Sequence, residues 1–250
     1  MLQAFRNFLT RRTFAYKARN KAMNMFSSFE NFKAIRKKAE DSRKDTNRPH
    51  EVLYFHKVDD PYSHLTIHFI EKFKSTYDVK FKSILVGEEN PAALHEPSLY
   101  TDYCLEDVKR IAPFYGVDFP GIDYPKKDLV NKANAILSAV SEEEFESIAK
   151  QVSHAIWSDD QEKLNSLGES YQTSEAEVIE KLKTGNEIRN NCDYYFGSAF
   201  YYEKELYWGV DRLNHLEDRL TELGVNKTSE NAPVCLPVSY THLRAHETPI

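Results

Sequence analysis

The stretch VLYFHKVDDPYSHL, residues 52–65, joins a short apolar run to two aspartates, a proline and the beginning of a helical pattern. Its β-branched, aromatic and aliphatic residues predict a buried strand. Asp59 or Asp60 is a suitable helix N-cap, and Pro61 then takes the first helical position, where its missing N–H costs nothing. Because a helix start carries unpaired N–H groups and a positive dipole end, this turn suits an anionic group.

The segments on either side predict an α/β core with a long helical insertion. Residues 79–86 read VKFKSILV and predict a second strand, parallel to the first because one helix connects the two. The connecting helix has one apolar face, made of Leu65, Phe69, Ile70, Phe73 and Tyr77. Residues 99–190 keep a helical pattern, residues 200–208 predict a closing hairpin, and Asp211 is expected to cap a last helix.

Two short motifs carry a family resemblance. The turn Asp60-Pro61-Tyr62-Ser63 resembles a Ser-Pro-Tyr-Ser turn, and residues 207–213, YWGVDRL, resemble a W-G-x-D-R-L helix start. Both are typical of DsbA-like thioredoxin-fold proteins, in the branch with 2-hydroxychromene-2-carboxylate isomerases and kappa-class glutathione transferases. The resemblance covers about residues 51–223. It implies an α/β, thioredoxin-like fold with an inserted all-helical subdomain.

The resemblance also implies a function and a set of site residues. The family's members are oxidoreductases or glutathione-dependent isomerases and transferases, which implies glutathione or another small thiol or polar ligand here. By the motif match the catalytic positions are Asp60 and Ser63. The implied ligand-binding positions are Pro61, Tyr62, Asn90, Asp211 and Arg212.

The sequence departs from the family pattern in ways that limit the chemistry. A Cys-x-x-Cys pair is absent, which excludes dithiol exchange by the usual route. Asp60 replaces the family's first serine, and a carboxylate has no proton to donate at neutral pH and repels a thiolate. No proline lies between Pro125 and Pro233, so the family's cis-proline is missing and the peptide near Ala199 is predicted to be trans. No Lys or Arg lies between Gly87 and Asp102.

Several residues keep two interpretations. Asp60 is either a general base or an N-cap. Asp211 either anchors a polar ligand or caps the last helix, with Arg212 paired to acidic neighbours. His64 and His68, four residues apart, could bind zinc with Asp59 or Asp60, although the spacing is common by chance. An aromatic cluster, Tyr194, Tyr195, Tyr201, Tyr202, Tyr207 and Trp208, either stacks on a substrate or packs the hairpin.

Composition narrows the class of protein further. Of 250 residues, 41% are hydrophobic and the net charge is -6, which suits a globular chain. No apolar run reaches about 18 residues, so no membrane span is expected. The three cysteines Cys104, Cys192 and Cys235 are widely separated, which favours a reducing, cytoplasmic compartment. Nucleic-acid binding has no support beyond a basic N-terminus.

We expect three regions along the chain. Residues 1–48 form a basic helical extension, read as a membrane- or partner-contacting segment, as an organellar transit peptide or as a solvated extension. Residues 49–225 form the DsbA-like domain, with the helical insertion at about 99–190. Residues 226–250 are interpreted as unstructured and artefactual, because SYTHLRAHET resembles translated sequencing-adapter sequence. A non-catalytic binding or scaffold module, contacting a membrane or partner through the N-terminus, is the alternative to a divergent enzyme-type protein.

Overall fold

The computed structural model describes residues 14–87 and 96–227. The predicted site residue Asn90 lies outside the described residues, as does nearly all of the predicted tail. The chain divides into two compact units, Met1–Pro49 and His50–Ile250. In the first unit, helices α2 (Phe14–Phe26) and α3 (Phe29–Asp45) follow one another, and Ser28 caps α3 by accepting a hydrogen bond from the backbone N–H of Asn31.

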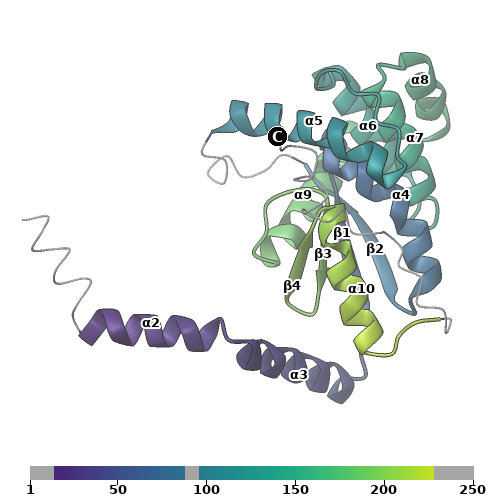
Figure 1. Ribbon diagram of the computed structural model, residues 1–250. Helices are drawn as coiled ribbons and strands as arrows, with labels where there is room; N and C mark the ends of the chain where they lie inside the picture. The colour runs from purple at the N-terminus through teal and green to yellow at the C-terminus, as the bar shows by residue number, and fades with distance from the viewer. Residues whose placement is uncertain (1–13, 88–95, 228–250) are drawn as a thin grey trace, which may run out of the picture. The chain divides into compact units, whose positions relative to one another are not determined.

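The second unit is built on a four-stranded sheet in the order β2-β1-β3-β4 (Figure 1). Its strands are β1 (Glu51–His56), β2 (Lys80–Leu85), β3 (Ala199–Tyr202) and β4 (Glu205–Trp208). β1 pairs with β2 in parallel and with β3 antiparallel, so that Tyr54 stands opposite Ser83 on one side and Phe200 on the other. The predicted parallel pair and its antiparallel hairpin partner are both confirmed.

The hairpin of β3 and β4 turns at Glu203 and Lys204, whose φ angles are 45° and 72°. Two central residues with positive φ give a two-residue turn, whose twist matches that of the flanking strands. The predicted hairpin is therefore confirmed, with its turn at Glu203-Lys204.

Alternation along β1 divides the core between the two faces of the sheet. Val52 and Tyr54 belong to the large core that includes helix α4 (Pro61–Thr76) and helix α10 (Leu213–Glu222). Leu53 and Phe55 point to the other face, because successive strand residues alternate, and pack there with Ile188 and Cys192. Helix α9 (Glu175–Asn191) supplies Ile188, so α9 covers that face.

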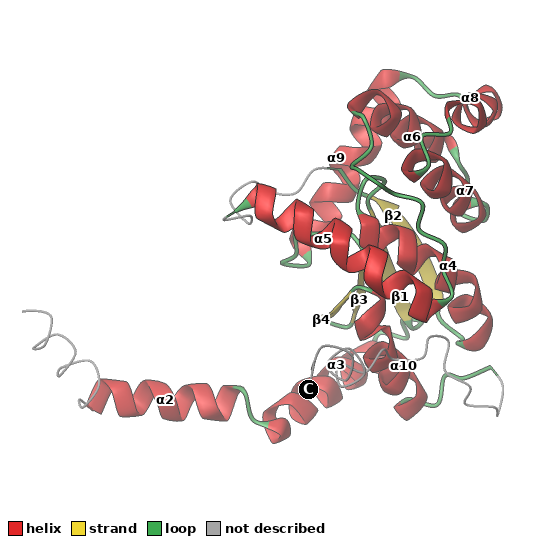
Figure 2. Ribbon diagram, turned by 45° about the horizontal axis from the view of Figure 1, so that its top comes forward, coloured by secondary structure: helices red, strands yellow, loops and turns green. Residues whose placement is uncertain are grey.

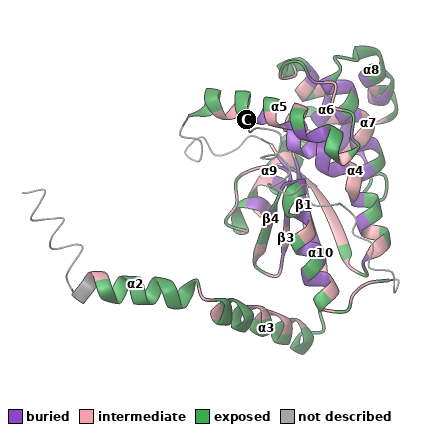
Figure 3. Cartoon of the chain, in the orientation of Figure 1, coloured by how far each residue is buried: buried purple, intermediate pink, exposed green. Residues whose placement is uncertain are grey.

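A run of helices fills the connection between β2 and β3, as predicted. It comprises α5 (Pro97–Ile111), the 3₁₀ turn η2 (Ala112–Tyr115), α6 (Lys127–Ala139), α7 (Phe145–Trp157), α8 (Gln161–Ser170) and α9. Helices α6, α7 and α8 pack on one another beyond one end of the sheet (Figure 2). Burial is concentrated in this bundle and in the strands (Figure 3).

The end of the fold differs from prediction in one detail. A 3₁₀ turn, η3 (Val210–Arg212), follows β4, and α10 starts only at Leu213. The N-cap position is Arg212, which makes no side-chain cap bond, so the expectation that Asp211 caps the last helix is wrong. The cause is Gly209, whose φ of 76° redirects the chain into the 3₁₀ turn before the helix.

Two further features concern the described residues as a whole. They contain no cis peptide bond, and the segment before β3 has Ser198 at a φ of 50°. Within the same residues, no helix combines the length and the apolar character that crossing a bilayer requires.

Candidate functional site

Asp60 lies at the junction of β1 and α4 and is the N-cap of α4. Its Oδ1 accepts from the backbone N–H of Tyr62 at 3.1 Å, and its Oδ2 accepts from the N–H of Ser63 at 3.1 Å. Two of the unpaired N–H groups at the helix start are thereby satisfied. The geometry shows that Asp60 caps α4. The catalytic role that the resemblance implies for Asp60 is a proposal.

Ser63 is buried in the first turn of α4 and is bonded on both sides. Its hydroxyl donates to Asp60 Oδ2 at 2.7 Å and accepts from the backbone N–H of Lys57 at 3.3 Å. This places three donors on one carboxylate and closes the loop between β1 and α4. The hydroxyl proton of Ser63 is therefore directed at Asp60 and away from any ligand.

Tyr62 connects the helix start to α5 and to the hairpin. Its hydroxyl donates to Asp107 Oδ2 at 2.7 Å, and its ring packs on Trp208 with the centroids 5.6 Å apart. Burial, followed by the hydrogen bond to Asp107, raises the pKa of Tyr62 far above its ordinary value. The phenol therefore stays protonated and acts as a fixed link.

A cavity of about 50 Å³ opens beside this turn; we call it the α4 crevice. It is bounded by the end of β1, the starts of α4 and α5, and the residues flanking β3 and β4. Four aromatic rings and two carboxylates dominate its lining, which comprises Lys57, Asp59, Asp60, Pro61, Tyr100, Thr101, Cys104, Tyr124, Phe196, Gly197 and Trp208. A buried drug-sized ligand needs roughly 300 Å³ or more, so the α4 crevice accepts one end of a ligand rather than a whole tripeptide.

The aromatic side of the α4 crevice is a stack of three rings. Phe196 lies between Tyr100 and Trp208, with centroid distances of 5.3 Å and 5.5 Å and interplanar angles of 18° and 24°. Trp208 remains 37% exposed. The sequence predicted an aromatic cluster here, but Tyr100 and Phe196 were not among its members.

The charges of the α4 crevice are partly matched among themselves. Lys57 Nζ lies 2.9 Å from Asp59 Oδ1. Asp60 faces the N–H groups at the start of α4, whose dipole offsets part of its charge. Asp107, bonded to Tyr62, adds another carboxylate nearby. The balance at the mouth of the α4 crevice is therefore acidic, which opposes a thiolate.

Cys104 lines the α4 crevice from α5 and is only 2% exposed. Burial raises the pKa of its thiol to about 12, and the carboxylates of Asp60 and Asp107 add to the rise. A thiol in this state is a poor nucleophile. Cys104 therefore does not substitute for the missing Cys-x-x-Cys pair.

The 3₁₀ turn η3, which carries Asp211 and Arg212, contacts α4, but neither residue lines the α4 crevice. Arg212 Nε is 3.7 Å from Asp211 Oδ2, and both side chains are more than half exposed. Partial desolvation raises the pKa of Asp211, and the Asp107 carboxylate adds to the rise. Asp107 thus lies within electrostatic reach of both helix starts, which brings the two predicted motifs together at one edge of the sheet.

The zinc alternative does not fit the histidines. Both ring nitrogens of His64 are engaged, Nδ1 with Ser153 Oγ at 2.9 Å and Nε2 with the Asp118 carbonyl at 2.8 Å. His68 packs edge-on against the His64 ring, with the centroids 5.2 Å apart. Among the described residues no group of three or more potential ligands is arranged to hold a metal ion.

The sequence analysis did not predict that residues of α5 contribute to the site. Tyr100, Cys104 and Asp107 lie at i, i+4 and i+7, so they share one face of α5, and that face meets the α4 crevice. The spacing is visible in the sequence as one mixed polar and aromatic face. Only tertiary packing shows that this face meets the turn at Asp60.

This sheet, with a helical insertion and a crevice at the start of the helix after β1, defines a DsbA-like thioredoxin fold. Comparison with solved structures leads to the same class. The chain resembles a 2-hydroxychromene-2-carboxylate isomerase, with a TM-score of 0.50 and 19% identity over 70% of this chain and 96% of that one. It also resembles a candidate protein disulfide isomerase from Nitrosomonas europaea, with a TM-score of 0.52 and 14% identity over 70% of this chain and 99% of that one.

At these identities the likeness establishes the fold, which is that of DsbA-like isomerases and oxidoreductases. No protein-family model and no curated protein sequence matches the chain.

Proposed function

We propose that this chain is a divergent DsbA-like protein of the isomerase and transferase type that binds a small polar ligand in the α4 crevice without dithiol redox turnover. The observation that carries the proposal is the α4 crevice itself. It opens at the turn Asp60 to Ser63, the position at which the resemblance places the family's active site. Aromatic rings and carboxylates line it together, which suits a ligand with one polar end.

The chemistry of the lining favours a cationic or hydrogen-bond-donating group over a thiolate. The hydroxyl protons of Ser63 and Tyr62 are both donated to carboxylates, Asp60 and Asp107. Neither is directed at a bound thiol. The rings of Tyr100, Phe196 and Trp208 and the acidic balance attract a cation. We therefore propose that an ammonium group of the ligand is recognised, whereas the competing hypothesis of a glutathione-dependent protein requires recognition of a thiol.

Asp60 serves to position the ligand in this proposal. Three hydrogen-bond donors stabilise its ionised form, which disfavours its taking a proton from a substrate. Asp211 and Arg212 lie outside the α4 crevice and are proposed to contact only a ligand that extends beyond it. The free thiols of Cys104 and Cys192 suit a reducing compartment, so we propose a cytoplasmic protein.

Titration of the full chain, followed by Trp208 fluorescence, tests the proposal. The ligands are a primary alkylammonium ion, glutathione and S-methylglutathione, which has no free thiol. We expect a saturable change with the ammonium ion that weakens in Asp60→Asn and persists in the control Asp128→Asn, which alters an exposed carboxylate of α6 outside the α4 crevice. Trp208→Phe should remove most of the signal, because the second tryptophan, Trp157, is buried and reaches the α4 crevice only through its contact with Tyr124.

Two results would overturn the proposal. Tighter binding of glutathione than of S-methylglutathione would show that the thiol is recognised, as in a glutathione-dependent enzyme. No saturable response to any of the three ligands would favour the alternative of a non-catalytic binding module.

A further inference from the structure

Helices α2 and α3 expose large apolar side chains that nothing in their own unit covers. None of residues 16–49 is buried. Met25 is 69% exposed and Phe26 is 70% exposed in α2. Met23 in α2 and Phe29, Phe32 and Ile35 in α3 are also exposed. In Figure 3 the described parts of α2 and α3 are green (exposed) and pink (intermediate), with no purple (buried). Exposed apolar side chains gathered in one short region mark an interaction surface.

Helix α2 places its two lysines and most of its apolar residues on different sides, while its third basic residue, Arg19, lies beside Phe26 at the edge of the apolar side. Lys17, Asn20, Lys21 and Asn24 lie at i, i+3, i+4 and i+7 and so share one side. Ala18, Ala22, Met25 and Phe26 lie at i, i+4, i+7 and i+8 and so share another side. A basic polar face beside an apolar face is the arrangement of a helix that lies in a membrane interface.

The positive charge of α2 is not cancelled among the described residues of its own unit. α2 contains Lys17, Arg19 and Lys21 and no acidic residue, and the first acidic residue of the sequence is Glu30. Lys17 and Lys21 form no ion pair with a described residue of their own unit.

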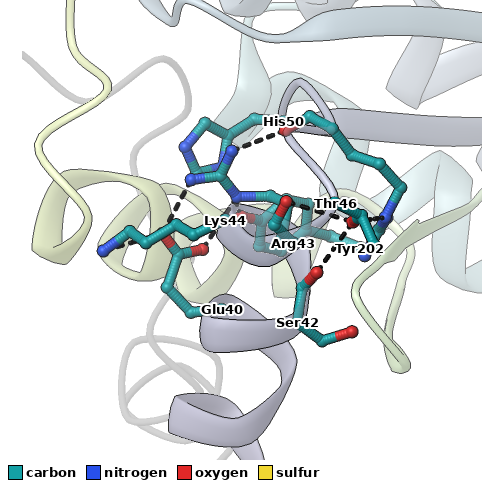
Figure 4. A network of polar contacts seen from close by, with 8 residues as sticks. Glu40, Ser42, Arg43, Lys44, Thr46, His50 and Tyr202 are labelled. Carbon is teal, nitrogen blue, oxygen red and sulfur yellow. Dashed lines mark hydrogen bonds and ion pairs between the residues drawn. The ribbon is translucent and has the colours of Figure 1, made fainter.

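Two of the four acidic residues of α3, Glu40 and Asp41, are paired with bases of the same helix. Arg43 Nη2 lies 2.7 Å and Lys44 Nζ 3.3 Å from Glu40 Oε1, as Figure 4 shows. Asp41 is paired with Lys37 at 2.9 Å. These acids therefore do not neutralise the lysines of α2.

Helix α3 carries basic groups directly over aromatic rings. Lys33 Nζ is 4.4 Å from the ring centroid of Phe29, and Arg36 Cζ is 4.1 Å from that of Phe32. Long basic side chains can keep their stems on apolar surface while their charged ends reach phosphate groups. Ring and cation therefore lie next to each other on α3, a pairing that suits the boundary between acyl chains and headgroups.

We propose that α2, with the exposed rings of α3, is an anchor that lies in the headgroup region of a bilayer rich in anionic lipid. With 13 residues α2 is only about 20 Å long, shorter than the roughly 30 Å hydrocarbon core, so it lies on the bilayer. A nucleic acid would use the lysines but not Met25 and Phe26. The anchor does not depend on the α4 crevice or its ligand.

Vesicle co-sedimentation of the full chain tests the anchor. The vesicles are phosphatidylcholine alone and phosphatidylcholine with about one third phosphatidylserine, which carries the anionic surface potential. We expect binding to the anionic vesicles only, weakened by added salt. The double variant Lys17→Gln/Lys21→Gln should weaken binding on the order of tenfold, and Met25→Ser/Phe26→Ser should weaken it at least as much.

Matched controls separate the anchor from general effects of charge and hydrophobicity. Lys127→Gln/Lys181→Gln removes the same charge from exposed positions on α6 and α9, and Ile122→Ser removes an apolar side chain that is 78% exposed. Both should bind the vesicles as the unaltered chain does. Circular dichroism of each variant verifies that the helices are kept.

Three outcomes would overturn the proposal: no binding to anionic vesicles, binding that the α2 variants leave unchanged, or binding to a single-stranded RNA that survives Met25→Ser/Phe26→Ser and exceeds vesicle binding. The last would assign the basic face to nucleic acid.

Discussion

Gly197 and Asp60 come from distant parts of the chain and meet so closely that no side chain fits between them. A Cβ atom at Gly197 would stand 2.9 Å from Asp60 Oδ2, and 2.8 Å from the Cβ of Lys57. Ser63 Oγ would be 3.3 Å away. The residue before the closing hairpin therefore forms one wall of the turn that caps α4, and only glycine allows this approach.

Gly197→Ala should therefore disturb the turn at the α4 crevice. We expect a loss of about 1–3 kcal/mol in the free energy of unfolding, measured by urea denaturation, because the added methyl group must displace Lys57 or Asp60. Ligand binding in the α4 crevice should fall with it. An unchanged unfolding free energy would mean that the turn at Asp60 is looser than this geometry implies.

Asp60→Ala should destabilise the fold through the loss of the cap on α4. Three donors lose their acceptor, namely the N–H groups of Tyr62 and Ser63 and the Ser63 hydroxyl. Loss of an N-cap costs about 0.5–2 kcal/mol, and we expect the upper end because Ser63 is buried. Asp59→Ala is the control, since Asp59 caps no helix and makes one salt bridge to the largely buried Lys57, so it should cost less than Asp60→Ala. Equal losses in urea denaturation would contradict the capping role.

The features that could be predicted from the sequence are those with local signals. The strand Glu51–His56 and the helix Pro61–Thr76 follow from an apolar run, an aspartate and a proline in adjacent positions. The capping role of Asp60 follows from the same signals. The hairpin turn at Glu203-Lys204 follows from its place between two aromatic runs.

Features that depend on distant contacts could not be predicted in this way. Asp107 and Cys104 become site residues only because α5 packs beside α4, and nothing in either helix specifies that contact. The cap expected at Asp211 failed for a local reason, since the geometry of Gly209 inserts a 3₁₀ turn. Periodicity predicted the order of strands and helices, and the resemblance of two motifs implied the thioredoxin-like fold, whereas the lining of the α4 crevice is a property of packing.

Two buried histidines should make the fold sensitive to mild acid. Burial lowers the pKa of His56 to about 3 and that of His64 to about 4. The unfolded values lie near 6.5, so the unfolded chain binds protons that the folded chain excludes. The contribution of the two neutral histidines to the stability of the fold is complete above about pH 6.5. It is lost as the pH falls toward their pKa values in the folded chain.

For each histidine, proton binding by the unfolded chain should lower the free energy of unfolding by roughly 2 kcal/mol when the pH falls from 7 to 5. Urea denaturation at both pH values measures the difference. His56→Gln should reduce this difference by about half, whatever its effect at pH 7. His215→Gln, at an exposed position on α10, should leave it unchanged. A pH response that His56→Gln does not alter would locate the sensitivity elsewhere.

Cys104 should resist alkylation as long as the chain is folded. Its pKa of about 12 leaves almost no thiolate at pH 8, and its side chain is buried. We expect labelling by iodoacetamide to be at least about a thousandfold slower in the folded chain than in urea, measured by peptide mass spectrometry. Cys192, which is less buried, should react sooner than Cys104. Rapid labelling of Cys104 in the folded chain would reveal an activated thiol and reopen the case for thiol chemistry.

Gly185 in α9 should tolerate substitution even less than Gly197, because the helix crosses β2 at this residue. A Cβ atom there would stand 1.9 Å from the carbonyl oxygen of Leu85, a backbone atom that a side-chain rotation cannot move. Gly185→Ala should therefore cost roughly 3 kcal/mol or more or prevent folding, measured by denaturation and by soluble yield. Gly168→Ala is the matched control, since Gly168 also lies within a helix but has open space at its Cβ position. That substitution should stabilise the chain by about 1 kcal/mol, because alanine is the better helix former. If both variants were equally stable, α9 would not lie against β2 as closely as the contact at Leu85 requires.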